Sequence, residues 1–483
     1  MLRSTLAVAI LLLASTAAAQ QRPLRTHPRV QEAIGLLEIW TDAQVAYQQI
    51  PGASMAVVHD QELVWSAGFG LANRERGVEA TPQTIYSICS ISKLFTSIGV
   101  MQLRDAGKVR LDDPVAGHLS WFTIRDAYPD APPVTIEGLL THSSGLPRES
   151  DTPYWSAPDF RFPTHDEIVR RLPEQEELYP AQTYHQYSNL GLTLAGEIVA
   201  AVSGQPYDGY VRDRILTPLG LASTTPEIPA SLHGTRLAVG YSATTRTGTR
   251  ESLPVFQGRG IAPAMAFAST VEDLGRFASW QFRVLHHGAD EVLSRNTLRE
   301  MQRVHWVDPD WKTTWGLGFV VFQQGDKTFV GHGGSCPGYR SNLQMQADDR
   351  IATIFAANAN GVNPGAFTRR AHEIMAPALA AAKDTSHAST PPNAEFAKYV
   401  GAYSEMPWGG EVAVLPWKGS LAMVYLPTDD PLGDLTELRH VRNHTFRRVR
   451  KDKALGEEIR FDVGPDGRAT RVWQHSNFSP RIR

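Results

Sequence analysis

The stretch YSICSISKLF, residues 86–95, contains the pattern S-x-x-K, with Ser90 and Lys93 three positions apart. Residues at this spacing share one face of a helix, so the lysine amine can reach the serine hydroxyl if a helix begins here. Free backbone N–H groups at a helix start also favour developing negative charge. Two interpretations follow: a nucleophilic serine with a lysine as its base, or a serine that caps a helix beside a solvated lysine. Taken alone, the pattern favours the second, because it is short and common.

Apolar residues around this stretch recur with helical and strand spacing. The spacing predicts a helix from Ser90 to Ala106 and an earlier helix from Val30 to Gln49. Between them, the runs SMAVVHD and ELVWSAGFG flank Asp60-Gln61 and predict a hairpin. Residues 110–260 are rich in Pro, Gly and aromatic residues, and they predict an insertion of short helices and loops.

Strand-like segments return from Trp315 onward, as WGLGFVVF, KTFVGHGG, SNLQMQA and RIATIFAAN, and a helix is predicted from Pro364 to Ala382. This order of elements implies one sheet whose first and last strands are far apart in the chain. The predicted fold class is therefore α/β (α+β), an antiparallel sheet flanked by helices with a mostly helical insertion. It occupies a predicted domain of residues 20–382.

The chain changes character after a polar Ser/Thr/Pro segment, KDTSHASTPPNAE, residues 383–395, which is typical of a linker. Residues 396–483 contain short apolar runs, several of them alternating, separated by turn residues. This spacing predicts a small antiparallel β-barrel as a C-terminal domain. The domain has no evident catalytic set. Three roles stay open for it: covering a cleft, mediating association, or binding at a surface.

Residues 1–19 have the features of a secretory signal peptide. Arg3 supplies a positive charge, an apolar run extends from Leu6 to Ala14, and an A-x-A cleavage site ends at Ala19. The apolar run is too short to span a membrane, and no cysteine follows the site to carry a lipid. We expect a secreted or periplasmic protein without a membrane anchor.

The composition is that of an ordinary globular protein, with 42% hydrophobic residues, 20% charged residues and a formal net charge of −3. It shows no basic footprint for nucleic acid. The His, Asp and Glu residues show no tight metal-ligand spacing, so neither a metal nor another cofactor is predicted. The two cysteines, Cys89 and Cys336, could pair in an oxidising compartment or stay as two buried thiols.

Two further motifs can complete an acyl-transfer site. The segment Tyr187–Asn189 has the pattern Y-x-N, with a phenol that can shuttle a proton and an amide that can hold a substrate carbonyl. The segment His332–Gly334 ends the strand-like run KTFVGHGG, where glycines let a substrate backbone approach closely. Each motif alone has an ordinary structural interpretation. Serine, lysine, tyrosine and a glycine-flanked strand, in this order, form a constellation typical of acyl transfer.

These ordered motifs resemble those of the penicillin-recognising serine hydrolases of the class C β-lactamase and D-alanyl-D-alanine peptidase type. The resemblance extends from about residue 30 to 382 and is carried by YSICSISKLFTS, VTIEGLLTHSSGL, YPAQTYHQYSNLGLTLAGEIV, FASTVEDLGRF, WGLGF and GHGGSCPGY. It implies a β-lactamase/transpeptidase-like fold, an acyl-enzyme mechanism without a cofactor, and a small-molecule or peptide substrate. The C-terminal domain resembles the lipocalin-like domains appended to some members of the family.

Carried over residue by residue, the resemblance makes Ser90 the acylated nucleophile, with Lys93 and Tyr187 sharing the acid and base steps. Asn189 would help to order Lys93 and the substrate amide. The backbone N–H groups of Ser90 and Ser335 would form the oxyanion hole, where losing one donor typically costs on the order of 100-fold in rate.

The chain departs from the β-lactamases where they carry K-[TS]-G. His332, Gly333 and Gly334 stand there, with a weaker charge and no hydroxyl for a substrate carboxylate. Arg340 could compensate with a bidentate contact, or it could be a surface or structural arginine. Family members with H-x-G include D-aminopeptidases, esterases and peptidase-like proteins, which favours peptides or esters as substrates.

The resemblance also bears on the two cysteines. In the family fold, the strand that ends in H-G-G runs beside the start of the serine helix. The positions of Cys89 and Cys336 resemble those of a disulfide in some class A carbapenem-hydrolysing β-lactamases, so we expect these two residues to be bonded. His142 could act as a base, but it is expected to be a hydrogen-bonded loop residue. Tyr154 and Trp155 could line a substrate cleft or pack the insertion, and packing is the expected role.

The sequence thus predicts an exported serine hydrolase that acts through an acyl-enzyme on amide or ester bonds. D-amino-acid peptides, peptidoglycan fragments and small esters are the expected substrates. A β-lactamase is the alternative within the same class of enzyme. From other classes, the chain could be a penicillin-binding or sensing module with little turnover, or a scaffold that acts through its β domain. The oligomeric state is not predicted.

Overall fold

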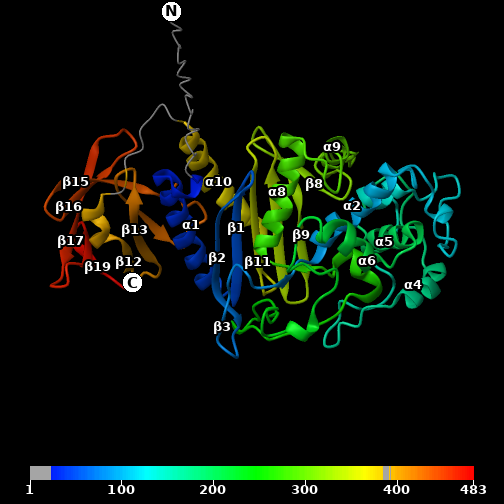
Figure 1. The fold of residues 1–483 in the computed structure, drawn as a ribbon. Helices are drawn as coiled ribbons and strands as arrows, with labels where there is room; N and C mark the ends of the chain where they lie inside the picture. The colour runs from blue at the N-terminus through cyan, green and yellow to red at the C-terminus, as the bar shows by residue number, and fades with distance from the viewer. Residues whose placement is uncertain (1–22, 385–390, 392) are drawn as a thin grey trace, which may run out of the picture.

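The computed structural model describes residues 23–384, 391 and 393–483, so the predicted signal peptide, residues 1–19, lies outside the described residues. The predicted linker, residues 383–395, is described only in part. The described chain forms a large α/β part and a small C-terminal barrel (Figure 1). Across these ranges, no helix has the length and apolar character needed to cross a membrane.

The centre of the α/β part is a nine-stranded antiparallel sheet with the strand order β3-β2-β1-β11-β10-β9-β8-β7-β6. The predicted hairpin is present, since β1 and β2 pair on either side of Asp60-Gln61. β1 also pairs with β11, so strands from the two ends of this part meet as predicted. The bounds of the strands are β1 Gly52–His59, β2 Glu62–Asn73, β3 Val78–Glu79, β6 Trp306–Val307, β7 Thr314–Trp315, β8 Val320–Gln324, β9 Lys327–Cys336, β10 Tyr339–Gln346 and β11 Ile351–Ala357.

Helices cover both faces of this sheet. α1 (Pro28–Tyr47) and α10 (Pro364–Lys383) pack on one face, and α8 (Val271–His287) packs on the other (Figure 1). β1 is consequently buried along its whole length. α1 begins at Pro28, before the predicted start at Val30. Proline suits the first position of a helix, because the N–H that it lacks would have no partner within the helix there. The other helices are α2 Ser92–Asp105, α3 Ile136–Thr141, α4 His165–Arg171, α5 Asn189–Ser203, α6 Tyr207–Val211, α7 Ala262–Met265 and α9 Arg295–Gln302.

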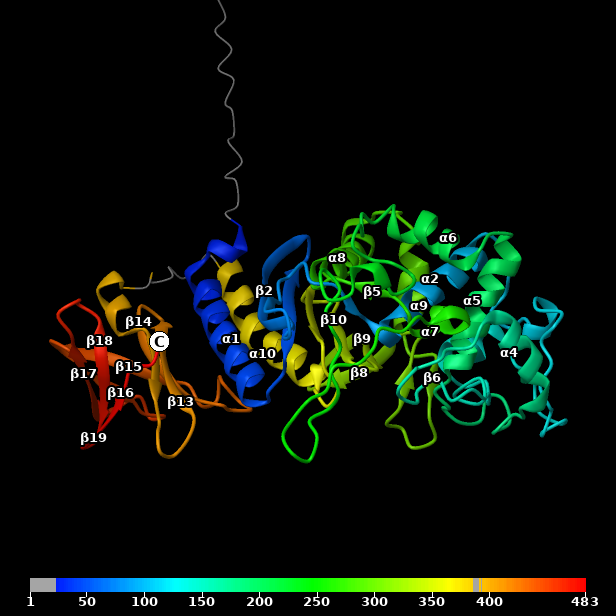
Figure 2. The same ribbon diagram turned by 90° about the horizontal axis from the view of Figure 1, so that it is seen from below.

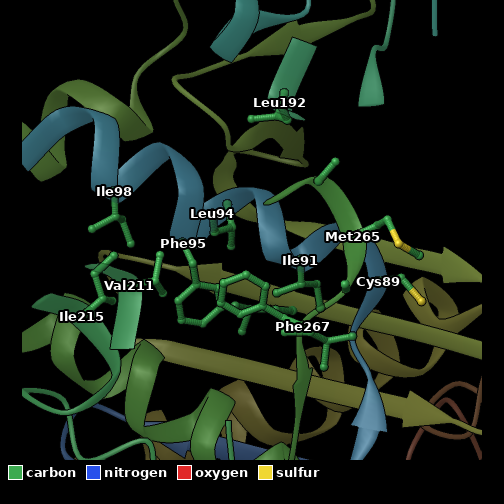
Figure 3. Close-up of a cluster of buried hydrophobic side chains, with 14 of the residues drawn as sticks. Cys89, Ile91, Leu94, Phe95, Ile98, Leu192, Val211, Ile215, Met265 and Phe267 are labelled. Carbon is green, nitrogen blue, oxygen red and sulfur yellow. The ribbon is translucent and has the colours of Figure 1, made fainter. Parts of the chain in front are cut away.

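The start of the serine helix differs from the prediction. Residues Cys89–Ile91 form a 3₁₀ turn, η2, and the α-helix begins only at Ser92. α2 is enclosed by apolar side chains from distant segments, with Phe95 stacked on Phe267 at 4.9 Å between ring centroids (Figure 3). A helix packed this closely holds the side chains at its N-terminal end in fixed positions.

The residues after the linker form the predicted antiparallel barrel, an eight-stranded sheet in the order β12 to β19. The barrel is nearly closed, because Tyr403 of β12 forms a bridge with Arg481, which follows β19. Aromatic side chains such as Phe446 and Phe461 fill its interior. The bounds of its strands are β12 Gly401–Ser404, β13 Glu411–Trp417, β14 Ser420–Leu426, β15 Thr436–Arg442, β16 Thr445–Val449, β17 Leu455–Val463, β18 Ala469–Gln474 and β19 Asn477–Pro480.

The barrel packs on α1, on the side of the sheet away from α2 (Figure 2). The indole N–H of Trp40 donates to the carbonyl of Thr428 at 2.8 Å, and Arg483 pairs with Asp42 of α1. Buried side chains of β13 and β14 join those of α1 in one apolar cluster. This position does not support a role of the barrel in covering a cleft at the start of α2.

Candidate active site

The turn before Ser90 is held against the end of β9. The predicted disulfide between Cys89 and Cys336 is present, with Cα atoms 5.7 Å apart. In addition, the hydroxyl of Ser341 donates to the carbonyl of Ile88 at 2.9 Å. Cys89 has a φ of 50°, a left-handed conformation that residues other than glycine adopt only when their surroundings require it. These two links hold the turn and present Ser90 half-buried.

Lys93 lies one helical turn beyond Ser90 and is fully buried, with 0% of its side chain exposed. Its amine is 3.1 Å from Ser90 Oγ, 2.8 Å from Asn189 Oδ1 and 2.8 Å from the carbonyl of Ala264. Burial lowers the pKa of Lys93 well below its usual value, and the nearby negative charge of Glu149 only partly opposes this. The site therefore favours a neutral amine next to the serine hydroxyl.

Tyr187 precedes α5 and its side chain is hydrogen-bonded to Ser90. Burial raises the pKa of the Tyr187 phenol, and the bond to Ser90 and the charge of Arg148 lower it by less. The phenol therefore keeps its proton at neutral pH. Lys93 Nζ lies 4.8 Å and the Arg148 guanidinium 4.9 Å from the centroid of its ring. Serine, amine and phenol thus meet at one point.

Asn189 is the first residue of α5, and Ser188 caps the helix by accepting from the N–H of Gly191 at 2.8 Å. The backbone N–H of Asn189 donates to the carbonyl of Arg148 at 2.8 Å. Its side chain reaches Lys93 with the oxygen and Glu149 with the nitrogen. The residue is buried, so its amide is fixed at both ends.

β9 places the HGG segment beside the turn that carries Ser90. His332 is buried, and its Nδ1–H donates to the carbonyl of Gly333 at 2.6 Å. Burial, followed by the charge of Lys93, lowers the pKa of His332 to about 3, so the ring is neutral at physiological pH. Gly333 and Ser335 point outward on the exposed side of the strand. The strand therefore supplies no fixed charge at the position of His332.

The two glycines of this segment serve different purposes. A Cβ on Gly334 would lie 2.3 Å from the carbonyl oxygen of Ile88, so the close approach of the two chains requires a glycine here. A Cβ on Gly333 would meet nothing nearer than 3.8 Å. Gly334 therefore admits the turn before the serine, and both glycines also line the cleft. That they let a substrate backbone approach stays a prediction.

A cleft of about 600 Å³ opens beside Ser90. Arg340 lies on its wall, half-buried and opposite Ser335 in the β9–β10 pairing. Within the described ranges, its guanidinium has no hydrogen bond or ion pair, although burial lowers its pKa. The lining contains two arginines and no carboxylate. It consists of Ser90, Arg148, Tyr187, Trp315, Val320, His332, Gly333, Gly334, Ser335, Arg340, Ser341, Val362, Asn363 and Pro364.

His142 is the hydrogen-bonded loop residue that the sequence predicts, since its Nδ1 accepts from the N–H of Ser188 at 3.1 Å. It also stacks on the ring of Tyr187, with centroids 4.2 Å apart, a contact that the sequence did not indicate. Trp315 packs edge-on against His142 at 4.7 Å and lines the cleft. Together these rings fix the orientation of the phenol.

The residues of the PYWSAPDF segment pack the insertion, as predicted, but they also border the site. The buried ring of Tyr154 contacts Trp155, and its hydroxyl donates to Glu149. Trp155 lines a hollow of about 330 Å³ that shares Arg148 and Ser335 with the main cleft. Glu149 was not predicted from the sequence, because no pattern around it distinguishes it from an ordinary surface carboxylate.

Comparison with known proteins identifies the class to which this fold and site belong. The profile of the Beta-lactamase family matches residues 38–376, and that of a domain of unknown function, DUF3471, matches residues 385–483. The chain therefore belongs to the β-lactamase and D-Ala-D-Ala carboxypeptidase family, with a C-terminal DUF3471 domain. It is a serine hydrolase of this family.

Individual relatives agree with this assignment. The chain is 30% identical over 350 residues to "Penicillin-binding protein 4" of Amycolatopsis lactamdurans, covering 69% of this chain and 87% of the relative. It is 28% identical over 327 residues to "Beta-lactamase-like protein 2" of Dictyostelium discoideum, covering 67% of this chain and 58% of the relative. This chain spans less than two thirds of the length of several relatives. One of them is a putative D-alanyl-D-alanine carboxypeptidase of Escherichia coli O157:H7, which is matched over 55% of its length.

Solved structures share the fold. A penicillin-binding protein homologue from Pyrococcus abyssi superposes with a TM-score of 0.63 at 23% identity, covering 92% of this chain and 99% of that one. A β-lactamase/D-alanine carboxypeptidase from Yersinia pestis superposes with a TM-score of 0.61 at 21% identity, covering 72% and 99%. At this identity the likeness establishes the fold alone.

Proposed function

We propose that the protein is an exported hydrolase that cleaves amide or ester bonds of D-amino-acid peptides, peptidoglycan fragments or small esters through an acyl-enzyme on Ser90. The observation that carries this proposal is the pair formed by Lys93 and Ser90. A fully buried amine with a strongly lowered pKa lies 3.1 Å from the serine hydroxyl, and a general base must be within this reach and in its neutral form.

In the acylation step, Ser90 Oγ bonds to the substrate carbonyl carbon while its proton passes to the neutral amine of Lys93. The carbonyl oxygen becomes an oxyanion, and the backbone N–H groups of Ser90 and Ser335 receive it. The bond to the leaving group then breaks. The departing nitrogen or oxygen takes a proton from the phenol of Tyr187, which the Lys93 ammonium reprotonates. An ester remains between Ser90 and the acyl group.

In the deacylation step, a water molecule attacks this ester and transfers one proton to the neutral amine of Lys93. The tetrahedral intermediate collapses, the acid product leaves, and Ser90 Oγ regains a proton. Each group returns to its starting state, so the proposed steps balance without an oxidant or a reductant. The raised pKa of Tyr187 suits the acid role, because the phenol enters the cycle protonated.

The charges of the cleft support a substrate with a carboxylate. His332 is neutral, so it does not replace the lysine that β-lactamases carry. Arg340 faces the same cleft with no partner among the described residues, and a guanidinium binds a carboxylate through two parallel hydrogen bonds. In this proposal Arg340 contacts the substrate carboxylate. Asn189 orders Lys93 and does not contact the substrate amide, because its buried side chain is bonded at both ends and does not line the cleft. The relative named as a penicillin-binding protein supports a site of this type.

Export is the part of the proposal that rests on the sequence. The predicted signal peptide, residues 1–19, would direct the chain to the periplasm or the medium. The Cys89–Cys336 disulfide is consistent with this location, because disulfides persist in oxidising compartments.

Steady-state kinetics on four compounds test the proposal: a D-alanyl-D-alanine peptide, a D-alanine anilide, a p-nitrophenyl ester and penicillin G. We expect hydrolysis of at least one of the first three, with loss of activity in the Ser90→Ala variant. Arg340→Gln should raise KM for the substrate with a free carboxylate and leave the ester unaffected. Rapid turnover of penicillin G alone would make the protein a β-lactamase. Activity that survives Ser90→Ala would refute the proposed nucleophile.

A further inference from the structure

Glu149 lies directly behind Asn189, on the side opposite Lys93. Asn189 Nδ2 donates to both carboxylate oxygens, at 2.9 and 3.0 Å. The hydroxyl of Tyr154 donates to the same carboxylate, and Arg148 forms an ion pair with it at 3.0 Å. Its backbone carbonyl also accepts from Gln175 Nε2 at 2.9 Å. The carboxylate is therefore held by two hydrogen-bond donors, Asn189 and Tyr154, and by one ion-pair partner, Arg148.

These contacts determine which way the amide of Asn189 points. An ionised carboxylate can only accept hydrogen bonds, so the group that faces it must be the NH₂ of the amide. The carbonyl oxygen Oδ1 must then face Lys93, as it does at 2.8 Å. This orientation follows from the chemistry of the partners rather than from the shape of the side chain, whose two ends have nearly the same size.

The fixed amide in turn determines where the amine of Lys93 presents its lone pair. The neutral amine has two N–H donors and one lone pair. Asn189 Oδ1 and the carbonyl of Ala264, each at 2.8 Å, can only accept, so they take both donors. The third neighbour is Ser90 Oγ at 3.1 Å, and the lone pair is left to accept the serine proton. If the amide were reversed, its NH₂ would compete for that lone pair.

We propose that Glu149 is a positioning residue, which locks the Asn189 amide so that neutral Lys93 directs its lone pair at Ser90. This inference rests on the proposed function, because it assumes that Lys93 is the base for acylation. A second effect accompanies the first: the negative charge of Glu149 raises the pKa of Lys93, against the lowering by burial. Removing that charge must therefore lower the pKa of Lys93.

The experiment is a double-mutant cycle on the acylation rate, measured as the single-turnover release of p-nitrophenol from a p-nitrophenyl ester. Glu149→Gln keeps the size of the side chain but replaces one oxygen by a donor. We expect acylation to fall by about 10- to 100-fold, the scale of a misplaced catalytic group. In the Asn189→Ala background the same change should cost less than about 3-fold, because residues that act through one another are not additive.

The pH profile separates positioning from a general structural role. Acylation requires neutral Lys93, so its rate rises with pH through the pKa of that residue. In Glu149→Gln this rise of the rate with pH should move to lower pH. Glu174→Gln, a change at an exposed residue, should leave the rate and the pH profile unaltered. Equal losses of acylation rate in the parent and in the Asn189→Ala background, together with an unchanged pH profile, would overturn the inference while leaving the nucleophile in place.

Two controls keep the result interpretable. Circular dichroism and thermal unfolding report whether Glu149→Gln is folded. If it is not, Tyr154→Phe replaces it, since this variant removes only one donor to the carboxylate and should slow acylation in the parent but not in the Asn189→Ala background. A wild-type protein that cleaves none of the peptide, the anilide and the ester in a Ser90-dependent way would refute the proposed function, and the inference about Glu149 with it.

Discussion

The amine of Lys93 lies 3.1 Å from the hydroxyl oxygen of Ser90, and the lysine side chain has no exposure to solvent. Burial lowers the pKa of this amine well below the usual value of a lysine. An exposed lysine at the same spacing would be charged at neutral pH and could not accept a proton. The function of the site therefore depends on the packing around α2 as much as on the S-x-x-K pattern.

The first prediction concerns pH. Because acylation requires neutral Lys93 and its pKa is depressed, the rate should reach its plateau at a pH well below the usual pKa of a lysine, and it should fall as acidification protonates the amine. Lys93→Ala should reduce acylation by about 100-fold or more, since general base catalysis contributes on this scale. Stopped-flow acylation rates across pH check both points. A rate that rises only above pH 10 would contradict them.

The second prediction compares adjacent glycines. Gly334→Ala places a Cβ 2.3 Å from the carbonyl oxygen of Ile88, so the strand and the turn must separate. We expect a loss of about 1–3 kcal/mol in the free energy of unfolding, as for other overpacked sites, and a marked fall in acylation. Gly333→Ala is the matched control and should leave stability unchanged. Chemical denaturation of both variants measures the difference, and equal stabilities would count against the described contact.

The third prediction concerns the disulfide. The unreduced protein should resist thiol alkylation even when denatured, and reduction should release two thiols from Cys89 and Cys336. Replacing both by alanine should cost about 2–5 kcal/mol of stability, the usual range for a native disulfide. Acylation should also slow, because the turn before Ser90 loses one of its two links to β9 and β10. Two alkylated cysteines in unreduced, denatured protein would rule the bond out.

The fourth prediction concerns His332 and stability at acidic pH. Its pKa is depressed to about 3 in the folded state, whereas an unfolded histidine takes up a proton near its usual pKa of about 6.5. Between these values the unfolded chain binds one more proton, so this residue makes stability fall as the pH decreases, by up to about 1.4 kcal/mol per pH unit. His332→Gln should flatten the profile by this amount. Denaturant titrations from pH 7 to pH 4 measure the difference, and parallel profiles would contradict the assignment.

The fifth prediction concerns the barrel. Trp40 packs on Phe367 and donates to Thr428 at the contact between α1 and the barrel, far from Ser90. Trp40→Ala should therefore cost about 3–5 kcal/mol of stability, as for other large-to-small changes in a core. Its kcat and KM should stay close to those of the parent at temperatures where it is folded. A selective loss of activity would indicate that the barrel acts on the cleft.

The sequence predicted those parts of the molecule that local patterns record. The hairpin around Asp60-Gln61, the late strands and the barrel follow from apolar spacing and turn residues. The family motifs place the Ser90, Lys93 and Tyr187 side chains in one site. The disulfide was predicted through the resemblance, because the spacing of two cysteines alone does not say whether they pair.

Other features depend on packing between segments that are distant in the chain. The stacking of His142 on Tyr187, the contact of Glu149 with Asn189 and the docking of the barrel on α1 each join segments whose sequences carry no matching pattern. The contact of Gly334 with the main chain at Ile88 was not predicted for the same reason. A glycine beside a cleft and a glycine beside another main chain look alike in sequence, and only the position of Ile88 separates them.

Acylation of Ser90 can be observed in a mass spectrum of the protein quenched in acid during turnover of a p-nitrophenyl ester, followed by peptide mapping. We predict one acyl group on the peptide that contains Ser90, absent from Ser90→Ala and slow to form in Lys93→Ala. An unmodified Ser90 peptide in protein that hydrolyses the ester, with the same rate in Ser90→Ala, would contradict it.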